Sequence, residues 1–237
     1  MDKSNLIEIK KGQTGTGLLI ENDGYISLEL GNNKRLFEDI NAVRKGGDEF
    51  YCPHPFVVSA VFQKYGIENA NGRIYPESVL RREVEKYMQK VHEKRGIGEC
   101  NHPSESTIDL SRVAINIIDL RWEGRTLVGE LEIVTSPGYR KYGIISCEGD
   151  QIANLILEGI KIGVSSRGLG SVTNKMGVLY VEDDYEIVCW DAVSDPSTPG
   201  AWISDSYEKL QPYLESKETE KSCLIEKLSK FDNWLNG

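Results

Sequence analysis

Residues 163–170 read Gly-Val-Ser-Ser-Arg-Gly-Leu-Gly, and the residues that lead into them alternate between apolar and small or polar side chains. This alternation is typical of a strand, in which successive side chains point to opposite faces. Ser166 then falls on the apolar face with Ile162 and Val164, whereas Ser165 falls on the other face. Because a reactive hydroxyl must point away from the packed core, the pattern favours Ser165 over Ser166 as a nucleophile.

A second run, residues 98–103, reads Gly-Glu-Cys-Asn-His-Pro and supplies a base for that nucleophile. His102, held between Asn101 and a proline, suits the residue that removes a proton from a serine hydroxyl. The backbone N–H groups of Arg167 and Gly168 suit an oxyanion pocket, and the guanidinium adds positive charge. The plainer alternative is that Ser-Ser-Arg-Gly is only a strand end and a turn, because serine often precedes glycine in turns.

The composition limits the class of protein. A chain of 237 residues with 39% hydrophobic content can bury one substantial core. With 28 basic and 37 acidic residues the net charge is −9, which argues against nucleic acid as a main partner. Five scattered cysteines indicate a reducing compartment. No apolar run is long enough for a membrane span or a signal peptide, so we expect a soluble, cytoplasmic protein.

The periodicity predicts an α+β protein in which strands outnumber helices. Pro76 opens a helix whose apolar residues recur on one face through Val91, and a shorter helix is expected over 151–159. Strands that follow one another without crossover helices argue against a doubly wound sheet. The expected strands cover 18–20, 25–30, 113–117, 127–133, 160–166, 168–173, 178–181 and 186–193, with a turn at 174–177.

Four blocks in this order give the chain a family resemblance. They are Asn-Ala-Asn-Gly-Arg-Ile-Tyr-Pro at 69–76, the run at 98–103, the run at 163–171, and the residues Asp191-Ala192-Val193, Pro196-Ser197, Pro199 and Ala201-Trp202. Together they resemble the prohead core proteases of tailed phages, of the T-even type. The resemblance implies a β-barrel-like core of mostly antiparallel strands flanked by helices, as in the herpesvirus assembly proteases. It also implies that Ser165 is the nucleophile and His102 the base.

The third catalytic residue is expected to be acidic, because the base needs an acceptor for its other ring nitrogen. Asp191 lies in a matching block on a late strand and is our choice. Glu99, three residues before His102, is the first alternative, and Asp195 is the second. The block at 69–76 carries no obvious chemistry, so we expect it to set a loop and start the helix, with Arg73 pairing a carboxylate near the site.

The resemblance implies a serine endopeptidase that cleaves scaffold and capsid proteins inside the phage prohead, in the host cytoplasm. No cofactor is expected, and the enzyme is expected to form homo-oligomers. We expect an N-terminal segment at 1–60, a protease core at 61–204 and a polar helical tail at 205–237. Proteases of this family cut after Glu in an aliphatic-x-Glu context and remove their own ends. This predicts self-cleavage after Glu226 and Glu8, with further matches at Glu38, Glu99 and Glu158.

Two other functions are compatible with the sequence. One is a structural protein of the prohead core that has the same fold but no activity, although the presence of both Ser165 and His102 argues against it. The other is a metal-binding module built on the pairs Cys52-Pro53-His54 and Cys100-Asn101-His102. Structural zinc sites more often use Cys-x-x-Cys spacing, so we expect no metal.

Overall fold

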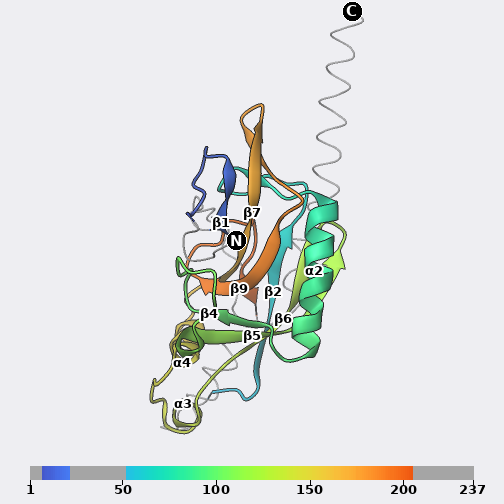
Figure 1. Cartoon of the computed structure of the whole chain (residues 1–237). Coiled ribbons are helices and arrows are strands. Elements are labelled where there is room, and N and C mark those ends of the chain that lie inside the picture. The colour runs from blue at the N-terminus through green and yellow to red at the C-terminus, as the bar shows by residue number, and fades with distance from the viewer. Residues whose placement is uncertain (1–6, 22–51, 205–237) are drawn as a thin grey trace, which may run out of the picture.

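Two β-sheets make up most of the structure, a computed structural model that describes residues 7–21 and 52–204 (Figure 1). All neighbouring strands in them run antiparallel except the pair β3–β8. The first sheet has the order β1–β7–β8–β3, and β9 also pairs with β7; its strands are β1 (Gly15–Ile20), β3 (Arg73–Ile74), β7 (Gly163–Lys175), β8 (Val178–Val181) and β9 (Glu186–Val193). The second has the order β10–β2–β6–β5–β4, with β2 (Phe56–Lys64), β4 (Ile97–Glu99), β5 (Val113–Glu123), β6 (Thr126–Ile133) and β10 (Ile203–Ser204).

The predicted α+β class with mostly antiparallel strands is confirmed, but the strands that the structure describes do not close into a barrel. The two sheets stay separate and meet through isolated bridges, Cys100 with Ala192 and Gly163 with Trp202. The expected boundary at residue 60 falls inside β2, whose residues continue to Lys64. Of the described helices, none is long and apolar enough to cross a membrane.

The helix predicted from Pro76 is confirmed as α2 (Glu77–His92), which runs along one side of the strands (Figure 1). Pro76 stands just before it in an extended conformation. The predicted apolar face is buried, including Leu80, Val84, Tyr87 and Val91. This face packs against β5 and β9, so burial of one stripe fixes the helix against both sheets.

Strand β7 is longer than predicted. The expected strands at 160–166 and 168–173 form one strand from Gly163 to Lys175. The expected turn at 174–177 is present in a shorter form, as Met176 and Gly177 both have positive φ, 55° and 90°. Two such residues form the tight turn that suits a twisted hairpin.

The end of the molecule with α3 (Pro137–Tyr142) and α4 (Glu148–Leu157) differs most from the prediction. The first of these helices was not predicted, although Ser136 caps it and Pro137 opens it, which is a recognised start signal. The second begins three residues before the predicted residue 151, and it buries Ile152 and Ile156 as expected. A short 3₁₀ helix, η2 (Leu110–Arg112), precedes β5.

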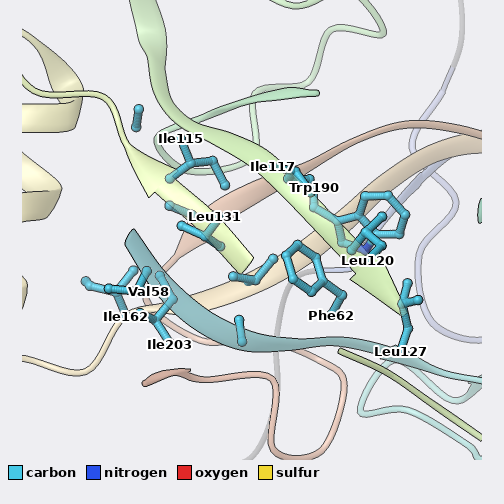
Figure 2. Packing of buried hydrophobic residues seen from close by; sticks show 14 of the residues in the cluster. Val58, Phe62, Ile115, Ile117, Leu120, Leu127, Leu131, Ile162, Trp190 and Ile203 are labelled. Carbon is cyan, nitrogen blue, oxygen red and sulfur yellow. The ribbon is translucent and has the colours of Figure 1, made fainter. Parts of the chain in front are cut away.

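The hydrophobic core is formed by side chains of both sheets (Figure 2), and the apolar face of α2 packs onto it. Trp190 of β9 stands at its centre, with its ring edge-to-face against Phe62 and Tyr87 at centroid distances of 5.7 and 4.8 Å. Such pairs contribute about 0.5–1.5 kcal/mol each beyond the area they bury. The core therefore holds β9 rigidly, and β9 carries Asp191.

The predicted strand at 25–30 and the tail at 205–237 lie outside the described residues.

Candidate functional site

The two serines lie on opposite faces of β7, as predicted. Ser165 is paired in register with Asp191 of β9, and Ser166 with Trp190. Directly opposite residues of an antiparallel pair point to the same face. Ser165 therefore shares a polar face with Asp191, whereas Ser166 shares the core face with Trp190.

Ser165 does not stand in an open cleft, contrary to our expectation. It is 1% exposed, and its hydroxyl donates a hydrogen bond of 2.5 Å to the backbone carbonyl of Glu21, the residue directly after β1. Strand β1 pairs antiparallel with β7 along residues 167–172, directly beyond the serine. A segment of the chain itself thus covers the candidate nucleophile.

His102 is brought to this face by the loop after β4. The Asn101 N–H donates to the carbonyl of Ala192 at 2.8 Å, and Asn101 has φ of +64°, which an asparagine tolerates better than most residues. The chain then turns so that His102 Nδ1 lies 2.7 Å from Asp191 Oδ2, with both side chains fully buried. The other ring nitrogen, Nε2, is buried and has no hydrogen-bond partner among the described residues.

Gly98 permits the close approach that this loop requires. A Cβ at this position would lie 1.9 Å from the carbonyl oxygen of Trp190 in β9. Only glycine therefore lets β4 pass so close to β9. This contact places the loop that carries His102 beside Asp191.

Asp191 is the acidic residue that contacts the histidine, as we expected of the third catalytic residue. Its Oδ1 accepts from the Glu99 backbone N–H at 2.9 Å. The Glu99 carboxylate, the first alternative, is instead bound by the Arg167 guanidinium and by the Asp109 N–H, the latter at 2.9 Å. Asp195, the second alternative, follows the end of β9 and is half-buried.

The position of Arg167 differs from the prediction that it lines an oxyanion pocket. Its guanidinium is fully buried, contacts the Glu99 carboxylate and lies 3.1 Å from Asp191 Oδ2. Burial acts to lower the pKa of Arg167, but the neighbouring Cys189 and Asp191 outweigh it and raise that pKa. Arg167 and Gly168 both have strand neighbours in β1 and β9, so their backbone is not the exposed end that we predicted for an oxyanion pocket.

A ring of donors around the Glu21 carboxylate is the part of the site that sequence reasoning missed. Oε2 accepts from Asn69 Nδ2 at 2.6 Å, Asn71 Nδ2 at 2.8 Å and Ser197 Oγ at 2.9 Å. Oε1 accepts from Arg73 Nη1 at 3.0 Å and from the Tyr75 hydroxyl. The only part predicted was that Arg73 would pair a carboxylate near the site, and this is confirmed.

The electrostatics of this ring favour an ionised Glu21. Burial acts to raise the pKa of its carboxyl, but the charge of Arg73 and hydrogen bonds from Tyr75 and Asn71 outweigh it and hold the pKa below 4.5. Burial and the adjacent Glu21 charge raise the pKa of the Tyr75 hydroxyl, so this group stays a donor. The charge and all five donors are therefore matched inside the protein.

Neither Cys-x-His pair is arranged as a metal site. Within residues 7–21 and 52–204, no group of three His, Cys, Asp or Glu side chains could hold a metal ion. The ring of His102 is engaged by Asp191. Burial raises the pKa of Cys100 to about 11, so its thiol is protonated at neutral pH and is a poor nucleophile or ligand.

Comparison with known proteins gives consistent matches. A family model described as prohead core protein serine protease matches residues 18–209. The prohead core protein protease of Enterobacteria phage T4 is 34% identical over 150 residues, which cover 62% of this chain and 67% of that protein. The solved structure of the bacteriophage T4 capsid assembly protease superposes with a TM-score of 0.53 at 30% identity, covering 58% of this chain and 80% of that one.

Proposed function

Because this chain belongs to the prohead core protein serine protease family, we propose that it is a serine endopeptidase with a Ser165–His102–Asp191 triad. Its substrates are the scaffold and capsid proteins of the phage prohead in which it is enclosed. Membership of the family establishes a protease role in head maturation. The triad, the identity of the substrates and self-processing are our proposals.

The single observation that supports the triad is the His102–Asp191 pair on the polar face of Ser165. The 2.7 Å contact at Nδ1 leaves Nε2 as the ring nitrogen without a partner. In the proposed mechanism, Nε2 takes the proton of Ser165 Oγ as the oxygen attacks the scissile carbonyl, and then gives it to the leaving amine. Asp191 fixes the tautomer and stabilises the imidazolium that forms.

Arg167 acts in this mechanism as a positioning residue. Its guanidinium lies against both Asp191 and Glu99, and its Nη1 donates to the Glu105 carbonyl at 2.7 Å, in the segment that follows His102. It thereby ties the strand of the nucleophile to the loop of the base. This role replaces the charge stabilisation that the sequence suggested for its side chain.

Self-processing remains part of the proposal. Glu226 and Glu38 lie outside the described residues. Glu8 is half-buried and bridged to Leu18, with the Leu18 N–H donating to the Ile7 carbonyl at 3.0 Å, so cleavage after Glu8 requires this bridge to open first. Glu99 is buried in an ion pair and Glu158 caps α4, so ordered backbone protects both from cleavage.

Labelling by a serine-reactive phosphonate tests the proposal. We expect one label per chain on Ser165 in the wild-type protein, located by mass spectrometry, and none in Ser165→Ala. The control variant Ser166→Ala should still be labelled. A folded wild-type protein that takes up no label would favour the inactive structural protein, and a label on Cys100 or Ser166 would contradict the assignment.

A further inference from the structure

The donors around Glu21 are not explained by the catalytic triad. Five side chains converge on one carboxylate that is 1% exposed. Three of them come from the single short block Asn69–Arg73, and a fourth, Tyr75, directly follows the strand in which this block ends. Burying a carboxylate and a guanidinium together is costly and does little for stability compared with apolar packing. A network of this kind therefore suggests recognition of a specific group.

The position of Glu21 relative to Ser165 indicates what is recognised. Glu21 places its side chain in the ring of donors, and its own backbone carbonyl oxygen lies 2.5 Å from Ser165 Oγ. In a serine protease, the residue before the scissile bond has its side chain in a specificity pocket and its carbonyl beside the nucleophile. Glu21 meets both conditions.

The strand that precedes Glu21 is also placed like a bound peptide. Strand β1 lies extended and antiparallel to β7, which is the pairing by which a sheet edge binds a peptide strand. Arg73 Nη1 donates to the carbonyl of Ile20 at 2.9 Å. Leu19-Ile20-Glu21 fits the aliphatic-x-Glu pattern, and Leu19 is fully buried. The sequence predictions did not include this match.

We propose that Asn69, Asn71, Arg73, Tyr75 and Ser197 form the pocket that selects glutamate at the cleaved bond, and that Glu21 occupies it as an internal substrate mimic. This inference rests on the proposed protease function and deepens it. The pocket excludes an apolar residue because its five donors would be left buried and unpaired. The pocket disfavours glutamine for two reasons. The amide nitrogen of a glutamine would face hydrogen-bond donors, and its neutral side chain would leave the charge of Arg73 without a counter-charge.

The pocket is tested by substrate preference. Peptide substrates that differ only in ending Leu-Ile-Glu or Leu-Ile-Gln before the cleaved bond should differ in kcat/KM by about 100-fold or more in favour of Glu. Tyr75→Phe and Ser197→Ala each remove one donor and should lower kcat/KM for the Glu peptide about 10-fold or more, with the Gln peptide much less affected. Arg73 is avoided because it also donates to the Ile9 carbonyl, so its replacement risks unfolding.

Arg81→Gln is the matched control, since Arg81 forms an exposed pair with Glu77 on α2 and should leave both rates unchanged. A preference for Glu that survives in both Tyr75→Phe and Ser197→Ala would overturn the pocket. An equal loss of kcat/KM for the Glu and Gln peptides in these two variants would also overturn it.

Binding to an inactive background separates this inference from the proposed catalytic mechanism. Acetyl-Leu-Ile-Glu should bind Ser165→Ala more tightly than acetyl-Leu-Ile-Gln does. Adding Glu21→Gln should tighten the binding of the Glu peptide further, because the internal occupant is weakened. If the protein cleaves nothing, this preference still supports the pocket; if it cleaves peptides but Glu21→Gln weakens binding of the Glu peptide, Glu21 is a structural anchor and the inference fails.

Discussion

Asp191 is held from several sides, and this decides what it can do. Its Oδ2 faces His102 Nδ1, while Oδ1 accepts from the Glu99 N–H and from the Cys189 thiol at 3.2 Å. A carboxylate fixed in this way can orient the imidazole with no freedom to swing aside. The Glu99 carboxylate lies nearby, but it forms an ion pair with Arg167 and does not contact the histidine.

Asp191→Asn should therefore lower kcat about 10⁴-fold while the protein stays folded, because an amide that donates to Nδ1 favours the wrong tautomer. Glu99→Gln should have a smaller effect on kcat and a larger one on the melting temperature, because it weakens the buried pair with Arg167. Peptide cleavage and thermal melts of both variants check this. The reverse order of the kcat effects would assign the third catalytic role to Glu99.

The three residues of the proposed triad could be chosen from the sequence because local patterns identify them. Strand alternation separated Ser165 from Ser166, and family blocks marked His102 and Asp191. The ring around Glu21 could not be predicted, because its members lie from 48 to 176 positions away from that residue. Alternation and helical spacing say nothing about which distant loops meet.

At the scale of elements, strand β4 is the part whose placement the site needs most. Gly98→Ala would push β4 away from the Trp190 carbonyl of β9. We expect a loss of about 1–3 kcal/mol of unfolding free energy from the overpacking, and a loss of peptide cleavage because His102 no longer reaches Asp191. Chemical denaturation and kinetics measure the two effects.

Gly138→Ala in α3 is the control for that variant. A Cβ there would meet only Ser136 Oγ, at 3.9 Å, and the residue is helical. It should keep full activity. If Gly98→Ala also keeps full activity, the contact between β4 and β9 does not position the histidine.

Helices and strands were predicted best where a single pattern of apolar residues, helical or alternating, continued over many residues. The apolar stripe of α2 and the alternation in β5 and β6 gave the right type of element, although β5 continues to Glu123. In the α3–α4 region the prediction missed α3 and the first three residues of α4, because the starts of both helices are ordered by one buried side chain. Asp150 accepts from the backbone N–H groups of Ser136 and Ser146 at 2.7 and 2.9 Å, and from both of their hydroxyls.

Asp150→Asn should destabilise the protein by about 2 kcal/mol, because an amide replaces a charged acceptor that serves two helix starts. Glu148→Gln, in the same first turn of α4, is the control and should cost less than about 1 kcal/mol. Urea denaturation followed by circular dichroism measures both. Equal effects would mean that Asp150 acts only through the helix dipole.

For the whole molecule, the buried charges connect folding to pH. The folded-state pKa of Glu21 is lowered, so its ionised form contributes stability that is present above its ordinary pKa of 4.5 and is lost as the pH falls through the folded value. Asp150, whose pKa is lowered by backbone and hydroxyl donors against the effect of burial, acts with the same sign.

We therefore expect the unfolding free energy of the wild-type protein to fall between about pH 5 and pH 3, and Glu21→Gln to fall less steeply in that range. Urea titrations at each pH give the slopes. Parallel slopes for the two proteins would show that Glu21 is not the ionised group in the ring.

The central claim is that Ser165 is the nucleophile, and the rate of cleavage of a Leu-Ile-Glu peptide by Ser165→Ala and Ser166→Ala tests it most directly. We predict that Ser165→Ala loses about 10⁴-fold or more in kcat but stays folded, with its melting temperature lowered only by the loss of the hydrogen bond from Ser165 to the Glu21 carbonyl. Ser166→Ala, which alters only the core face beside Trp190, should keep kcat within about tenfold of the wild type. A folded Ser165→Ala protein that cleaves at the wild-type rate, or a dead Ser166→Ala beside an active Ser165→Ala, would contradict the account.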